Sequence, residues 1–193
     1  MINDKKNFSE SNFESLVEKI NEDGYVIIKN AFSKDLALDL KNELKNISSE
    51  WSTPNAGTPY LNQNTPLIYN PDHKSEKILH FILRENKLLH DILQFYLNDK
   101  WYRRLPENEP NYILRASIAR SSGPNSLPLH IDSFIPSSGS IAFVMQVLFS
   151  LDESKVDNGS TVVVPKSHLS NRYATQEDLK DAIPLELERG DLA

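Results

Sequence analysis

The chain has 193 residues, of which 39% are hydrophobic and 25% charged, and this length and balance exclude a disordered or fibrous protein and fit one globular domain. Its net charge is −6 and its only adjacent arginines are Arg103 and Arg104, which argues against nucleic acid and anionic membranes as partners. No apolar run could span a bilayer, the N-terminus lacks the apolar segment of a secretory signal, and the absence of cysteine excludes disulfides and thiolate sites and fits the cytoplasm, where we expect the protein.

Apolar residues at helical spacing predict four helices in the first half of the chain, about residues 1–110. The first is expected to begin at Ser11, which forms a capping-box pattern with Glu14, and to end at Asp23-Gly24. Ser33 is expected to cap the second helix. The apolar positions that define the four helices are Phe13, Leu16, Val17 and Ile20; Leu36, Leu40, Leu44 and Ile47; Ile78, Leu79, Ile82 and Leu83; and Leu88, Leu89, Ile92, Leu93, Tyr96 and Leu97.

The segments around and after these helices favour loops and strands. Residues 25–28 are β-rich and predict a strand, whereas proline and glycine predict a loop over residues 51–71. Further strands are predicted at residues 112–120, 141–151, 161–164 and 184–188, with a turn at 157–159 and a short helix at 175–180. Helices followed by antiparallel strands indicate a single α+β domain whose second half, about residues 111–193, is a sandwich or barrel.

The sequence His130-Ile131-Asp132 is the first candidate for chemistry. If these residues are extended, both polar side chains point to the same face, and a further histidine from a neighbouring strand would complete the two-histidine, one-carboxylate set that holds Fe(II). The alternative is a surface strand end with a hydrogen-bonded histidine, because this spacing also arises by chance.

Gln146 is the second candidate, because it interrupts the apolar run of residues 141–151. An amide on an otherwise apolar strand is expected to be a buried polar group that needs a partner. A satisfied core amide and an exposed strand face remain the two structural alternatives.

Taken together, several segments resemble the phytanoyl-CoA dioxygenase family. They are residues 24–29, 129–133, 145–147, 151–152, 157–168 and 187–193. The most specific piece is Asn158-Gly159-x-Thr161 followed by Pro165-x-Ser167-His168. The resemblance covers nearly the whole chain from about residue 13.

This resemblance implies an Fe(II)- and 2-oxoglutarate-dependent dioxygenase that hydroxylates a small molecule with O2. It implies a double-stranded β-helix, a cupin-like jelly roll, with the N-terminal helices packed on one side. The family's metal histidine falls on His130 and its metal carboxylate on Asp132. Gln146 and Arg115 match positions that contact 2-oxoglutarate in similar sequences, while an exposed strand arginine is the alternative for Arg115. No catalytic residue beyond the metal ligands is implied.

The third metal ligand departs from the family pattern. In the family a histidine and then an arginine for 2-oxoglutarate follow the turn that matches Gly190-Asp191, and only Leu192 and Ala193 follow it here. We therefore expect a β-roll that is incomplete at its C-terminus, weak activity of this chain alone, and self-association through an uncovered sheet edge. His168 is a less favoured replacement ligand than a residue that stabilises a loop or lines the pocket.

Two other functions remain open at this stage. The first is a non-catalytic jelly-roll binding domain that has lost the iron site. The second is a cupin-like metalloenzyme that does not use 2-oxoglutarate. The substrate itself is not predicted, because the loops at residues 51–71 and 133–140 that would select it are the least interpretable segments.

Overall fold

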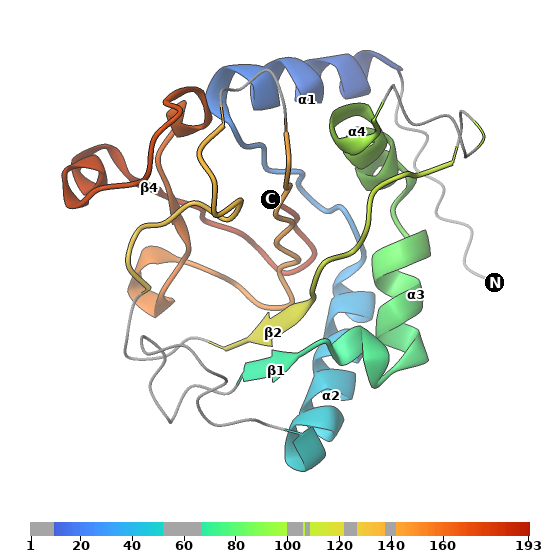
Figure 1. Cartoon of the computed structure of the whole chain (residues 1–193). Helices are drawn as coiled ribbons and strands as arrows, with labels where there is room; N and C mark the ends of the chain where they lie inside the picture. The colour runs from blue at the N-terminus through green and yellow to red at the C-terminus, as the bar shows by residue number, and fades with distance from the viewer. Residues whose placement is uncertain (1–9, 52–66, 100–105, 107–108, 122–126, 138–141) are drawn as a thin grey trace.

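The computed structural model describes residues 10–51, 67–99, 106, 109–121, 127–137 and 142–193. Among the described residues, the α-helices all lie in the first half of the chain, as predicted, whereas short strands and 3-10 turns make up most of the second half (Figure 1). The helices are α1 (Glu10–Asp23), α2 (Lys34–Trp51), α3 (Glu76–Arg84) and α4 (Lys87–Leu97). The strands are β1 (Leu67–Tyr69), β2 (Ile118–Arg120), β3 (Val162–Val163) and β4 (Ile183–Pro184). The 3-10 turns are η1 (Pro71–His73), η2 (Val156–Asn158), η3 (Ser167–Leu169) and η4 (Gln176–Asp181).

Side-chain caps explain where three of the helices begin. Ser33 Oγ accepts a hydrogen bond from the Leu36 amide at 3.1 Å, which confirms the predicted start of α2. Ser75 and Asn86 cap α3 and α4 in the same way. Helix α1 begins at Glu10, so the prediction that Ser11 is its N-cap is wrong: Ser11 lies inside the helix.

The described strands form two separate antiparallel pairs rather than a closed roll. In one pair Ile68 of β1 faces Ala119 of β2, and in the other Val163 of β3 faces Ile183 of β4. Strand β1 lies within the predicted loop 51–71, and that part of the prediction is wrong, because proline here precedes and follows the strand instead of interrupting it. Residues 52–66 of the predicted loop lie outside the described residues.

Two of the predicted strands are reduced to single bridges. Residues 25–28 and the described part of the other segment, residues 142–151, form no regular strand, but Ile28 and Phe149 both bridge to Leu192. The Ile28 amide donates to Leu192 O at 2.7 Å, and on the other side the Leu148 amide donates to Ala193 O at 2.8 Å. The last three residues therefore run between two distant segments, and each pairing is too short for a regular strand.

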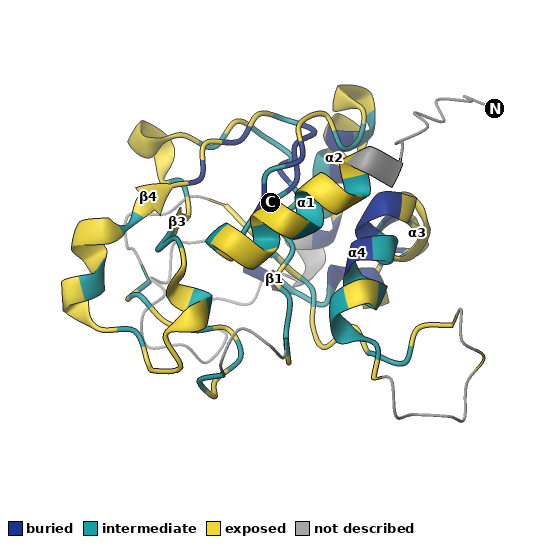
Figure 2. Ribbon diagram, turned by 90° about the horizontal axis from the view of Figure 1, so that it is seen from above, coloured by how far each residue is buried: buried dark blue, intermediate teal, exposed yellow. Residues whose placement is uncertain are grey.

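The apolar core consists of two clusters that share the ring of Phe149. One joins α4 to the C-terminal residues, and the other joins α2, α3 and β1. The buried members are Val26, Ile28, Leu88, Leu89, Ile92 and Leu192 in the first cluster, and Leu40, Ile47, Ile68, Ile78 and Phe81 in the second. Figure 2 shows buried residues gathered on α2, α3 and α4, whereas the segments around β3 and β4 are largely exposed.

A buried carboxylate fastens the C-terminal residues to the first half of the chain. Asp191 is 1% exposed, and its Oδ1 accepts from the Asn30 amide at 2.9 Å. Its Oδ2 accepts from Lys29 Nζ and from the Glu188 amide, both at 2.8 Å. The fold thus anchors residues 188–193 through polar contacts as well as through Leu192. No helix among the described residues has the length and apolar character needed to cross a bilayer.

Candidate metal centre

His130 and Asp132 lie in an irregular segment that ends in a turn, so the predicted strand is wrong. Residues 127–131 have no regular structure, and Asp132 and Ser133 form a turn in which the Phe134 amide donates to Ile131 O at 3.4 Å. The two side chains nevertheless meet: His130 Nε2 lies 3.4 Å from Asp132 Oδ1. The imidazole and the carboxylate therefore meet without a regular strand around them.

A backbone contact fixes which nitrogen of His130 is available. His130 Nδ1 lies 2.8 Å from the carbonyl oxygen of Pro128. A carbonyl oxygen only accepts hydrogen bonds, so Nδ1 must carry the proton, and Nε2 of the neutral ring has a free lone pair. Metal-binding histidines in proteins are commonly oriented by such a bond from the second nitrogen to a carbonyl.

The donor atoms of this pair suit a divalent cation. The Nε2 lone pair of the neutral imidazole and an oxygen of the Asp132 carboxylate face each other at 3.4 Å, and two such acceptors repel each other unless a proton or a metal ion lies between them. Imidazole nitrogen and carboxylate oxygen are ligands that Fe(II) accepts. Both side chains are about half exposed, at 52% and 53%, so a ligand can reach them. Within the described residues, no third His, Cys, Asp or Glu joins them to form a metal-binding group.

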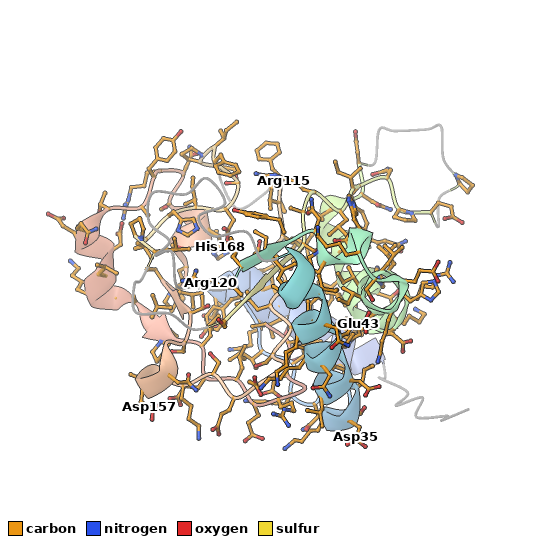
Figure 3. All side chains as sticks on the ribbon, turned by 90° about the horizontal axis from the view of Figure 1, so that it is seen from below. Asp35, Glu43, Arg115, Arg120, Asp157 and His168 are labelled. Atoms are coloured by element: carbon orange, nitrogen blue, oxygen red, sulfur yellow. The ribbon has the colours of Figure 1, made fainter. Side chains whose placement is uncertain are left out.

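Arg115 is linked to this turn through Phe134. It lies before β2 on the exposed surface, and its guanidinium carbon is 4.3 Å above the centre of the Phe134 ring. Phe134 follows Asp132 by two residues, so the predicted cofactor residue and the predicted metal ligands belong to neighbouring parts of one surface. Figure 3 shows Arg115 at the opposite end of the view from Asp35, which lies in the first turn of α2. Arg115 makes no ion pair with any carboxylate that the structure describes.

Gln146 does not occupy the buried position that the sequence predicted. Its neighbours Met145 and Val147 pack against the first core cluster, and the alternation of the extended chain turns Gln146 outward, where it is exposed. The expectation of a buried amide is therefore wrong, and one of the two alternatives, the exposed face, is correct. Its predicted contact with 2-oxoglutarate stays a prediction.

His168 stabilises a loop. Its Nε2 donates to the carbonyl oxygen of Asn21 at 3.1 Å, and its ring covers Gly24, where an added Cβ would lie 2.4 Å from Nδ1. The neighbouring Lys166 amide donates to Asp23 O at 2.8 Å. These contacts attach η3 to the C-terminal end of α1, which is the structural role that the sequence favoured over metal binding.

Phe134 is the residue of this surface that the sequence did not identify. It has a positive φ of 61° and a side chain that is 63% exposed, a combination that neither apolar periodicity nor turn chemistry predicts for phenylalanine. Its position two residues after the His-x-Asp sequence is the one signal that could have drawn attention to it.

Two of the solved structures of similar fold hold a metal ion and 2-oxoglutarate (alpha ketoglutarate). The epimerase SnoN in complex with Fe3+, alpha ketoglutarate and nogalamycin RO is 15% identical, with a TM-score of 0.59 over 95% of this chain and 73% of that chain. HygX from Streptomyces hygroscopicus, with nickel and 2-oxoglutarate bound, is 15% identical, with a TM-score of 0.64 over 92% and 75%. A second structure of SnoN, described as the non-heme alpha ketoglutarate dependent epimerase from nogalamycin biosynthesis, is 16% identical, with a TM-score of 0.58 over 95% of this chain and 72% of that chain. No curated protein sequence matches the chain.

These likenesses indicate a cupin-like fold, although the described strands are too short to display the jelly roll directly. A family match covers all but the first nineteen residues: residues 20–193 match phytanoyl-CoA dioxygenase (PhyH). The chain belongs to the phytanoyl-CoA dioxygenase family.

Proposed function

We propose that this protein is an Fe(II)- and 2-oxoglutarate-dependent dioxygenase that hydroxylates a small organic molecule. The observation that carries the proposal is the meeting of His130 Nε2 and Asp132 Oδ1 at 3.4 Å, with the opposite ring nitrogen held by Pro128 O. Family membership and the ligands of the similar structures support the same chemistry.

His130 and Asp132 would hold the metal. When bound, Fe(II) would allow O2 to oxidise 2-oxoglutarate and the substrate together, so that 2-oxoglutarate, O2 and R–H yield succinate, CO2 and R–OH. The protein's part is to present a neutral imidazole and an ionised carboxylate, and the Pro128 carbonyl keeps the imidazole in the required tautomer.

Arg115 and Gln146 are the residues that we assign to 2-oxoglutarate. Arg115 has no carboxylate partner among the described residues and can bind a carboxylate of the cosubstrate through paired N–H groups. Gln146 is exposed, so its amide can also donate to that cosubstrate. Both residues act in binding and orientation, which leaves the metal ligands as the chemical centre.

The test is 2-oxoglutarate turnover, measured as succinate release with Fe(II) and ascorbate. His130→Ala and Asp132→Ala should each lower succinate release by about 100-fold or more, since even the indirect partners of metal ligands contribute 10- to 100-fold. The chain offers a matched control in His73→Ala. His73 Nε2 is also 3.4 Å from a carboxylate, that of Asp72, but Asp72 is already bound by Ser117 Oγ. Equal activity of the three variants and wild type would refute the assignment.

A non-catalytic binding domain is the alternative, and one observation favours it: the described residues supply only two ligands at this centre. Titration with Mn(II), followed by electron paramagnetic resonance, separates the two functions. The dioxygenase requires one bound Mn(II) that is lost in Asp132→Ala. A binding domain that has lost the iron site predicts no specific Mn(II) binding and no succinate release. Metal-dependent activity without 2-oxoglutarate would instead indicate the third possibility, a cupin-like metalloenzyme.

A further inference from the structure

Phe134 adopts a backbone conformation that is unfavourable for its type. Its φ of 61° lies in the left-handed region, which bulky side chains rarely occupy. Burial does not offset this cost, because the side chain is 63% exposed. A residue that is strained and yet contributes little to the core points to a role outside folding, since such outliers concentrate at functional sites.

The left-handed residue belongs to the same turn as the metal-binding pair. The Phe134 amide donates to Ile131 O at 3.4 Å, and Ser133 Oγ donates to Ile135 O at 2.8 Å. These bonds hold the backbone on both sides of Phe134. The turn that begins at Asp132 therefore also sets the backbone from which the Phe134 ring projects.

Among the described residues, the ring has one charged partner, Arg115. The guanidinium carbon lies 4.3 Å from the ring centroid, within the range of a cation–π contact. A phenylalanine ring has no lone pair, so the five N–H donors of the guanidinium can still bind oxygen acceptors. Because no described carboxylate pairs with Arg115, those donors remain free for an anionic ligand.

We propose that Phe134 is a positioning residue, whose ring holds the Arg115 guanidinium beside the His130–Asp132 turn so that it binds a carboxylate of 2-oxoglutarate. This proposal rests on the proposed function, because it uses the assignment of 2-oxoglutarate to Arg115. It adds a residue that has no polar atom in its side chain and touches neither metal nor cosubstrate. The strain at Phe134 is then the cost of preorganising an arginine that would otherwise sample many rotamers.

Three substitutions at position 134 distinguish the contribution of the aromatic ring from that of the backbone conformation. Phe134→Leu removes the ring and should weaken 2-oxoglutarate binding about two- to fivefold, the range of an exposed cation–π contact. Phe134→Trp keeps an aromatic face and should retain wild-type affinity. Phe134→Gly relaxes the positive φ but lacks the ring, so it should bind as weakly as Phe134→Leu while unfolding no more easily than wild type.

The experiment measures 2-oxoglutarate binding by calorimetry in the presence of Mn(II), without turnover. Tyr173→Leu is the matched control, because Tyr173 is an aromatic residue of similar exposure, 61%, between η3 and η4. It should leave the affinity unchanged. A second readout needs neither metal nor cosubstrate: the Nε–Hε resonance of Arg115 in the full chain should shift in Phe134→Leu and stay near its wild-type position in Phe134→Trp.

The double variant Arg115→Ala/Phe134→Leu decides whether the ring acts through Arg115. It should bind 2-oxoglutarate no more weakly than Arg115→Ala alone. An additive loss would overturn the proposal, as would unchanged affinity and an unchanged Arg115 resonance in Phe134→Leu. A wild-type chain that binds no 2-oxoglutarate with Mn(II) contradicts the proposed function as well, so the two failures are distinguishable.

Discussion

Replacement of Asp191 by asparagine tests the contact that fastens the C-terminal residues to the rest of the chain. The side chain is 1% exposed and accepts three hydrogen bonds, one at Oδ1 and two at Oδ2. Asparagine has nearly the same shape but replaces one acceptor oxygen with a donor. Asp191→Asn therefore changes hydrogen bonding and charge without creating a cavity.

The cost follows from the positions of the three donors. With its nitrogen in place of Oδ2, the amide faces Lys29 Nζ and the Glu188 amide, and both bonds are lost. With its nitrogen in place of Oδ1, it loses the bond from the Asn30 amide and places two donors together. A hydrogen bond to a charged acceptor contributes about 1.5–3 kcal/mol, so either orientation should cost roughly 2–3 kcal/mol. The Lys29 ammonium adds less than about 1 kcal/mol, because it is 56% exposed.

Urea denaturation followed by circular dichroism measures this cost. With a slope of about 2 kcal/mol per molar urea, Asp191→Asn should lower the midpoint by roughly 1–1.5 M. Lys29→Met is the control, because it keeps the apolar stem of the side chain and removes only the exposed ammonium, and its midpoint should stay close to wild type. If Lys29→Met destabilises as much as Asp191→Asn, the ion pair and not the backbone amides holds the carboxylate, and the reasoning is wrong.

Two further predictions concern the same regions. Burial alone would raise the pKa of Asp191, but Lys29 and the Asn30 and Glu188 amides outweigh it and hold the pKa below its usual value. The ionised carboxylate therefore stabilises the fold fully above about pH 4, and this stabilisation is lost as pH falls through the lower folded-state pKa. The loss of stability on acidification should accordingly be shallower in Asp191→Asn than in wild type. Gly24→Ala should lower the free energy of unfolding by at least about 1–2 kcal/mol, because φ is +84° and the new Cβ would lie 2.4 Å from His168 Nδ1. Thermal melts of Gly24→Ala, with and without His168→Ala, measure this loss, and removal of the imidazole ring should recover part of it.

The helices could be predicted from the sequence because their information is local. The cap at Ser33 and the apolar stripe that includes Leu40 and Ile47 lie in one continuous segment, residues 33–47, and the structure confirms both. The predicted strand at residues 141–151 depends on a partner far along the chain. Its partners in the structure, Asp191 to Ala193, lie more than 40 residues further along the chain, where no local pattern identifies them.

The sequence singled out the residues of the candidate site but did not predict their local backbone conformation. The spacing of His130 and Asp132 identified a pair whose side chains do meet, although the predicted reason, a strand with alternating faces, is wrong. Phe134, the last residue of the turn that follows, has a left-handed backbone conformation that no propensity scale predicts for phenylalanine. The predicted burial of Gln146 is wrong for a related reason. In an extended segment with one core-facing side, apolar neighbours do not bury the residue between them.

The side chains that we propose for chemistry are separate from the side chains that stabilise the fold. The side chains that we assign to the metal and to 2-oxoglutarate are all exposed or half-exposed, whereas the two apolar clusters and Asp191 are buried. Substitutions at exposed positions usually change the free energy of unfolding by less than about 0.5 kcal/mol. His130→Ala, Asp132→Ala and Arg115→Ala should therefore melt like wild type, so that a loss of metal or 2-oxoglutarate binding in them reports on the site alone. Any of the three that unfolds as readily as Asp191→Asn would place its side chain in the structural framework instead.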